Sequence, residues 1–203
     1  MLYIGVVAPL TGEYASNGEE MLRGIKLYIE QMNKSGELHG KRIELTTKDD
    51  QNDPQDAKHI AHDLSLNNKV LLVLGHYSSA ACGAAGNQYK KFGLPAITAS
   101  ATAETITDEN SWYFRSNVSS SLQTELLATY LNKILHKKKV LLIADKGNLW
   151  AESVYSSFKN ACEDLSFPIS KHEEWYFDSR KNATEVEERL DDIINDIWTD
   201  WKE

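Results

Sequence analysis

The sequence predicts an α/β protein that is built on a doubly wound parallel sheet. Strand-like apolar runs alternate with helix-like segments four times within about the first 100 residues, which is the pattern of such folds. Runs such as Leu2–Ala8 and Val70–Leu74 are apolar at almost every position, as in strands that are covered on both faces. The alternation restarts after a polar stretch, so we expect two Rossmann-like lobes, residues 1–117 and residues 118–203.

The first lobe shows the clearest alternation. Strands are expected at residues 2–8, 42–48, 70–74 and 94–98, with a short fifth strand at 112–115. One helix begins near Ser16, which forms a capping-box pattern with Glu19. Another begins at Asp53, an N-cap residue that is followed by Pro54. A third helix, rich in small residues, is expected from Ser79 to Lys91.

The second lobe repeats the pattern with fewer strands. Helices are expected at residues 122–134, 150–165 and 186–197, and strands at 140–145 and near 172–177. Sheets usually contain about four to six strands. We therefore expect the second lobe to be incomplete within these 203 residues.

Composition narrows the classes of function. Hydrophobic residues make up 41% of the chain and charged residues 26%, as in ordinary soluble proteins. The net charge of −8 disfavours nucleic-acid binding, because the phosphate backbone is also negative. We expect no direct membrane insertion, since no apolar run approaches the ~20 residues of a spanning helix. We also expect no signal peptide in this sequence, because residues 1–4 lead directly into a strand-like segment. Cys82 and Cys162 lack metal-ligand spacing and are expected to be buried.

Two loops that follow strands carry hydroxyl groups on small residues. One contains Tyr77-Ser78-Ser79 after the third strand, and the other is Ser100-Ala101-Thr102 after the fourth. In open parallel sheets, ligands bind beyond the carboxyl ends of the strands. A helix start there adds unpaired N–H groups and a partial positive charge. Together the two loops predict a cradle for one carboxylate, although serine and threonine at such positions are also ordinary helix caps.

An aromatic wall is expected beside this cradle for the apolar part of a ligand. Trp150 follows a strand of the second lobe and is the first candidate, as a residue that faces the cradle across a cleft. A buried position at a helix start is an equal alternative, because tryptophan is highly buried on average. Tyr77 is the second candidate for the wall. Closure of the two lobes about residues 115–119 is the expected capture movement.

At these residues the sequence resembles the type I periplasmic binding proteins, and among them the branched-chain amino-acid (leucine/isoleucine/valine) binding subfamily. Residues 4–12, IGVVAPLTG, resemble the first strand and the following loop of that family. The turn NKSGELHGK at 33–41 and the segment DDQNDP at 49–54 are similar to two further family segments. The resemblance extends from Tyr3 to about Glu152.

The resemblance implies an extracytoplasmic protein that captures an amino-acid-like, carboxylate-bearing ligand for uptake by an ABC transporter. Ser79 and Thr102 are similar in position to the donors that bind the ligand α-carboxylate. The backbone near Ser100 and Ala101 is similar to the acceptors of its ammonium group.

The resemblance also bears on the rest of the site and on partners. Trp150 resembles the aromatic residue that closes over the ligand, and Asn17 stands where some members have a cleft-lining aromatic residue. The implied location is periplasmic or extracellular, and the implied partners are a membrane permease or receptor subunits. No cofactor is implied.

Other functions stay open at this point. The same module serves as the ligand-sensing domain of chemoreceptors and sensor kinases. A Rossmann-like enzyme is a more distant alternative, since neither G-x-G-x-x-G nor G-x-S-x-G occurs, and we expect no catalytic residues. His59 and His62 are expected on the solvated face of a helix rather than on a metal. Asp49 and Asp50 are interpreted as a solvated turn.

Overall fold

The computed structural model describes residues 1–138, 140–167 and 175–200. The chain divides into two compact units, residues 1–118 and residues 119–203. Each unit is an α/β arrangement in its own right, so the predicted fold class is confirmed. The lobe boundary predicted after residue 117 falls one residue before this division.

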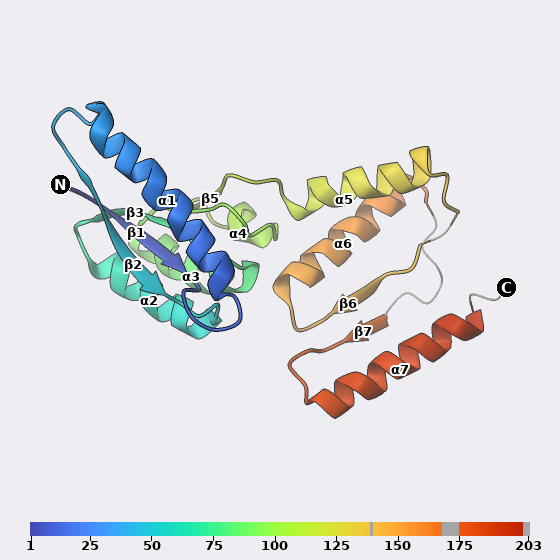
Figure 1. Ribbon diagram of the computed structural model, residues 1–203. Helices are drawn as coiled ribbons and strands as arrows, with labels where there is room; N and C mark the ends of the chain where they lie inside the picture. Colours follow the sequence, from blue (N-terminus) through green and yellow to red (C-terminus); the bar gives the residue numbers. More distant parts are fainter. Residues whose placement is uncertain (139, 168–174, 201–203) are drawn as a thin grey trace. The chain divides into compact units, whose positions relative to one another are not determined.

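The first unit is a five-stranded parallel sheet with helices on both faces (Figure 1). The strand order is β2-β1-β3-β4-β5. Because the chain steps from β1 to β2 in one direction and from β2 to β3 in the other, right-handed crossovers place α1 on the face opposite α2 and α3. The elements are β1 Leu2–Ala8, α1 Ala15–Ser35, β2 Ile43–Asp49, α2 Pro54–Leu66, β3 Val70–Leu74, α3 Ser79–Phe92, β4 Ala96–Thr98, α4 Thr105–Asp108 and β5 Tyr113–Arg115.

The core of the first unit lies around the central strands. β1 pairs with β2 from Leu2 opposite Ile43 to Ala8 opposite Asp49, and with β3 on its other side. The last three residues of β1 are fully buried, as are Val73 of β3 and Ala96 of β4. The nearly continuous apolar runs in the sequence therefore correspond to strands with both faces covered.

The start of α1 differs from the prediction. The helix begins at Ala15, and the preceding residue, Tyr14, makes no capping hydrogen bond through its side chain. Ser16 lies inside the first turn, so the predicted capping box is wrong. The chain instead enters the helix through backbone bonds, with the N–H of Ala15 donating to Gly12 O and that of Gly18 to Tyr14 O. By contrast, the Asp53 cap of α2 is confirmed, since its carboxylate accepts from two N–H groups of the first turn.

The second unit contains a two-stranded parallel sheet, in which Ile143 pairs with Trp175 and Asp145 with Phe177. The predicted strand at 140–145 is shorter than expected, and the predicted residues 172–174 lie outside the described residues. The elements are α5 Ser120–Thr129, a π-helical turn η1 Tyr130–Ile134, β6 Ile143–Asp145, α6 Leu149–Asp164, β7 Trp175–Phe177 and α7 Ala183–Asp200.

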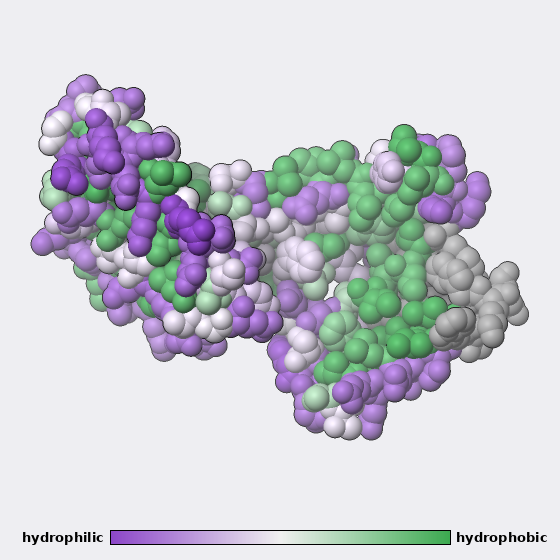
Figure 2. Space-filling view, in the orientation of Figure 1, coloured by the Kyte–Doolittle hydropathy of each residue, from purple (hydrophilic) through white to green (hydrophobic). Residues whose placement is uncertain are grey.

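The core of the second unit lies between α5 and α6. Its buried members are Ala128, Phe158, Ala161, Cys162 and Phe167. Beside this core an apolar groove of about 460 Å³ runs along β6, between side chains of α5 and α6. Figure 2 shows apolar surface gathered over this part of the unit. Large apolar side chains such as Leu126 and Ile134 are more than half exposed here.

Two further expectations concern the whole chain. Within the described residues, no helix is long and apolar enough to cross a membrane. Cys82 and Cys162 are both buried, as predicted, and both are free thiols.

Candidate functional site

The strand order of the first unit reverses between β1 and β3. In open parallel sheets this reversal, at the carboxyl ends of the strands, is the usual place for a ligand. Gly75 ends β3 at this point with φ +137, a conformation that favours glycine. A Cβ atom on Gly75 would lie 2.2 Å from Val7 O of β1. Glycine therefore allows the loop after β3 to leave close to the backbone of β1.

The structure brings the two predicted hydroxyl loops together. Two hydrogen bonds join them: Ser100 Oγ donates to Tyr77 O at 2.5 Å, and Ala103 N donates to Ser79 Oγ at 3.3 Å. A third bond ties the first loop to the end of β4, where Thr98 Oγ1 donates to His76 O at 3.0 Å. We call residues 75–79 the donor loop and residues 99–104 the facing loop. These cross-links hold both loops as one rigid rim at the carboxyl edge of the sheet.

The serine side chains of this rim have separate roles. Ser78 is the N-cap of α3, where its hydroxyl accepts from Ala81 N at 3.3 Å. Ser79 is buried, with 3% exposure, and accepts from the facing loop, which leaves its own hydroxyl hydrogen to donate. The N–H groups of Ser79 and Ala80 stand in the first turn of α3, where an α-helix supplies no acceptor. Ser79 is therefore the serine that is suited to bind an anion.

The facing loop is held from behind by β5. The Arg115 guanidinium donates to Thr102 O at 2.6 Å, to Ala103 O at 3.2 Å and to Glu104 O at 3.3 Å. It also donates to Thr107 Oγ1 at 2.6 Å. Thr102 is buried at 9% exposure. The Arg115 side chain thus fixes the backbone conformation of the facing loop, which carries Thr102.

The backbone groups of Ser100 and Ala101 are also engaged. Ser100 O accepts from Asn117 Nδ2 at 3.0 Å, and the N–H groups of Ser100 and Ala101 donate to Thr98 Oγ1 at 3.4 and 3.2 Å. A carbonyl oxygen has two lone pairs, so Ser100 O retains capacity for one more donor.

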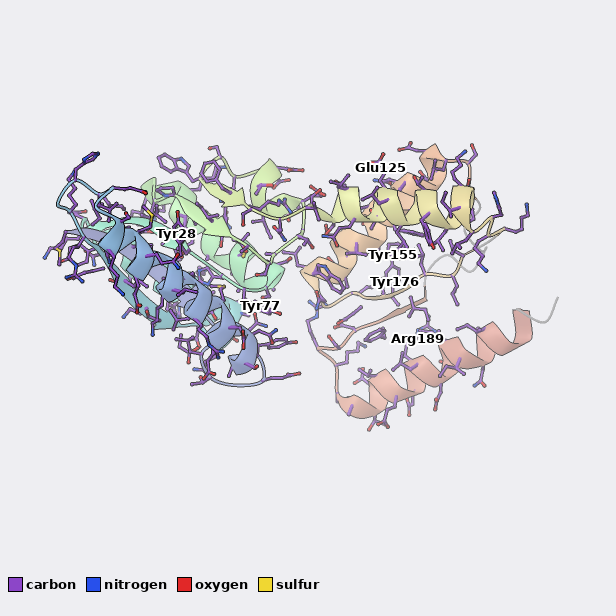
Figure 3. All side chains as sticks on the ribbon, turned by 45° about the horizontal axis from the view of Figure 1, so that its top comes forward. Tyr28, Tyr77, Glu125, Tyr155, Tyr176 and Arg189 are labelled. Atoms are coloured by element: carbon purple, nitrogen blue, oxygen red, sulfur yellow. The ribbon has the colours of Figure 1, made fainter. Side chains whose placement is uncertain are left out.

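The other predicted site residues lie in different places. Tyr77 is in the donor loop (Figure 3). Its ring centre is 6.1 Å from that of Tyr14, the residue before α1. Asn17 is exposed in the first turn of α1. Trp150 is the second residue of α6 in the second unit, half exposed, and lines the apolar groove beside β6. Its role as a wall for the cradle stays a prediction.

A buried polar chain lies behind the donor loop, and the sequence interpretation missed it. His76 Nδ1 is 2.6 Å from Asp50 Oδ2, and His76 Nε2 is 2.9 Å from the Tyr89 hydroxyl. All three residues are fully buried. We call them the Asp–His–Tyr chain. The interpretation of Asp50 as part of a solvated turn is therefore wrong, because its side chain is fully buried and is bonded to the His76 ring of the donor loop.

Tyr113 of β5 extends this network to the backbone of the donor loop. Its hydroxyl donates to Gly75 O at 2.6 Å and accepts from His76 N at 2.9 Å. Burial raises the pKa of Tyr113 and of Tyr89 well above the ordinary value of tyrosine, so both phenols keep their protons. Burial likewise raises the pKa of the Cys82 thiol to about 11, and this thiol donates to His76 O.

Asp49, next to Asp50, holds the loop after β1. Its carboxylate accepts from Leu10 N at 2.8 Å, from Thr11 Oγ1 at 2.6 Å and from Gln51 N at 2.9 Å. Partial burial raises the pKa of Asp49, but these hydrogen bonds outweigh it and lower the pKa below the ordinary value. The sequence shows only that Asp49 and Asp50 both lie at the end of a strand. It does not show that the Asp50 side chain is buried while that of Asp49 stays partly exposed.

The histidines of α2 show no metal-binding arrangement. His62 Nδ1 is 3.4 Å from Gln88 Oε1, and its ring packs against Phe92. In the described part of the chain no group of three or more histidine, cysteine or acidic side chains is arranged to hold a metal ion.

Comparison with known proteins matches this architecture to one family. The family model described as periplasmic binding protein matches residues 2–183. The chain belongs to the periplasmic binding proteins. Together with the relatives below, this confirms the predicted resemblance to the type I proteins of the branched-chain amino-acid binding subfamily. The family consists of binding proteins of transport systems, so the expectation of a non-enzyme is confirmed.

Two curated relatives come from Pseudomonas aeruginosa. An amino acid binding protein is 34% identical over 144 residues, which cover 70% of this chain and 38% of that protein. A leucine-, isoleucine-, valine-, threonine- and alanine-binding protein is 29% identical over 171 residues, which cover 84% of this chain and 45% of that protein. This periplasmic binding protein chain therefore spans less than half the length of these relatives.

Solved structures agree on the fold. A leucine-binding protein of Thermotoga maritima has a TM-score of 0.80 at 20% identity, covering 96% of this chain and 54% of that protein. The branched-chain amino-acid transporter substrate-binding protein LivJ of Streptococcus pneumoniae, solved with isoleucine, has a TM-score of 0.71 at 28% identity, covering 79% of this chain and 46% of that protein. A solute-binding protein of Rhodopseudomonas palustris, solved with 3,4-dihydroxybenzoic acid, has a TM-score of 0.72 at 25% identity, covering 83% and 46%.

Proposed function

We propose that this chain is a solute-binding protein that captures a small amino-acid-like ligand through its carboxylate and presents it to an ABC transporter. The observation that carries the proposal is the pair of cross-linked loops that follow β3 and β4 at the carboxyl edge of the sheet. There Ser79 offers a hydroxyl hydrogen beside the open N–H groups of α3. A carboxylate accepts several such hydrogen bonds at once, and the helix start favours its charge.

The names of the relatives support an acid of this kind. The two bacterial relatives are named for amino acids, and the solved neighbours hold isoleucine in one case and an aromatic acid in another. A carboxylate is the group that these two ligands share. We assign the ligand to the amino acids because the curated relatives, whose identity reaches 34%, are named for them.

Capture is proposed to involve both units. Residues 115–119 span the division between them and serve as the hinge, while Trp150 closes over the apolar part of the ligand. Thr102 supplies a further donor from the facing loop. The proposed location is the periplasm or the extracellular face, with a membrane permease as the partner.

Titration calorimetry with three related compounds tests the ligand class. L-Leucine is expected to bind, whereas L-leucinamide, which lacks the carboxylate, is expected to give no heat. 4-Methylpentanoate, which lacks the ammonium group, is expected to bind more weakly. Equal binding of L-leucine and L-leucinamide would contradict a carboxylate cradle.

Two serine variants test the site. Ser79→Ala removes the proposed donor and is expected to weaken L-leucine binding by about 1–3 kcal/mol, because a charged group loses a hydrogen bond. Ser65→Ala is the matched control, since Ser65 lies on α2 and donates to Ala61 O. Equal affinity in both folded variants would remove Ser79 from the site.

A further inference from the structure

The Asp–His–Tyr chain is satisfied at each of its polar atoms. Tyr89 keeps its proton and can donate to His76 Nε2. We assign the hydrogen bonds in this sense, with the imidazole hydrogen on Nδ1 donating to Asp50 Oδ2. The second oxygen of Asp50 accepts from Asn52 N at 3.1 Å. Buried polar chains with complete partners fix a single geometry, whereas a missing partner is costly.

Three residues outside this chain, Tyr113, Thr98 and Cys82, hold the backbone of His76. The His76 N–H donates to the Tyr113 hydroxyl, and its carbonyl accepts from Thr98 Oγ1 and from Cys82 Sγ. His76 is therefore fixed through its ring, its N–H and its carbonyl at once. Ser79 follows only three residues later, so a rotation at His76 moves the donor that the site depends on.

The chain also couples three separate segments. Asp50 follows β2, His76 follows β3, and Tyr89 lies on the fourth turn of α3, the helix whose N-terminus faces the site. The rings of His76 and Tyr89 are 5.9 Å apart, and Tyr89 packs edge-on against Tyr113 at the same distance. The contacts of His76 and Tyr89 thus fix the orientation of α3 and the conformation of the donor loop relative to each other.

We propose that the Asp–His–Tyr chain is a positioning device, which holds Ser79 and the N-terminus of α3 in their ligand-binding arrangement before the ligand arrives. Affinity then depends on three side chains that do not touch the ligand, because a preorganised loop loses less conformational freedom on binding. The inference rests on the proposed function only for the effect on affinity. The ordering of the loop is independent of what the loop binds.

A tyrosine pair tests the effect on affinity. Tyr89→Phe removes one hydroxyl and leaves the ring, and L-leucine binding is expected to weaken about fivefold to tenfold, the usual effect of one lost hydrogen bond. Tyr28→Phe is the matched control, because Tyr28 is 61% exposed on α1 (Figure 3), and its affinity is expected to be unchanged. All titrations are done at a temperature where circular dichroism shows each variant to be folded.

Substitutions of His76 separate positioning from general stability. The amide of His76→Asn reaches the place of Nδ1 and keeps the link to Asp50, whereas that of His76→Gln reaches the place of Nε2 and keeps the link to Tyr89. Both are expected to bind more tightly than His76→Ala. In the Tyr89→Phe background the advantage of His76→Gln should disappear. A set of variants that differ in melting temperature but share the wild-type affinity would overturn the proposal.

Amide hydrogen exchange in the ligand-free protein gives a readout that needs no ligand. Peptides that contain residues 78–82 and 100–103 are expected to exchange faster in Tyr89→Phe than in the wild type, while peptides from α1 stay unchanged. If the wild type binds none of the amino acids, the proposed function fails, and the exchange comparison alone decides the positioning role. Unchanged exchange in the folded variant overturns it.

Discussion

The Arg115 guanidinium is the strongest single tether of the facing loop, and its removal has a calculable effect. It makes two short hydrogen bonds of 2.6 Å and two longer ones of 3.2 and 3.3 Å, and its side chain is 10% exposed. Hydrogen bonds to charged groups contribute about 1.5–3 kcal/mol each when well formed, and the longer pair contributes less. In Arg115→Leu the freed carbonyls partly regain water, so we expect a net loss of about 2–4 kcal/mol.

Urea unfolding measures this loss, with hydrogen exchange of first-unit peptides as the signal so that the second unit does not contribute. Arg23→Leu is the control, because Arg23 is 71% exposed and pairs with Glu20 at 3.4 Å on the surface of α1. Such exposed pairs contribute about 0–1 kcal/mol. Arg115→Lys should fall between the two, since an ammonium group does not span four acceptors. Equal losses in Arg115→Leu and Arg23→Leu would refute the tether.

Three further predictions follow from the same structure. Burial raises the pKa of Cys82 from 9.0 to about 11, and it also raises the pKa values of Tyr89 and Tyr113. The first unit should therefore keep its full stability below about pH 9 and lose stability as the pH rises through 11. Urea unfolding at several pH values across that range measures this loss. Phe158→Ala should destabilise the second unit by about 3–5 kcal/mol in thermal unfolding, because Phe158 is 4% exposed within its core. Asp53→Ala should destabilise the first unit by about 0.5–2 kcal/mol in urea, since two N–H groups of α2 lose their acceptor.

The fold could be predicted because its signals are local. The apolar runs of β1 and β3 and the Asp53-Pro54 start of α2 are each contained in a few consecutive residues. The strand β6 was harder, because apolar residues from Val140 onward are shared between the strand and the groove beside it. Apolarity alone does not distinguish strand pairing from groove lining.

The sequence predicted which loops form the candidate site, but not the role of each side chain within them. The sequence located the two hydroxyl loops, but it did not show that Ser78 caps α3 while Ser79 bonds across to the facing loop. That division depends on which serine points toward the facing loop, which is a property of the packing between segments that are distant in the sequence. Asp50 and His76 are 26 residues apart, so their contact leaves no local pattern in the sequence.

The tie between the facing loop and β5 has a thermodynamic consequence for the junction between the units. Arg115 and Asn117, which hold Thr102 O and Ser100 O, lie within a few residues of the division after Val118. In the proposed capture, a movement of the junction that displaces Arg115 or Asn117 would change the contacts that hold the facing loop, and this links ligand affinity to the conformation of the junction. Linkage is reciprocal. If the ligand favours one conformation of the junction by a given factor, that conformation binds the ligand more tightly by the same factor.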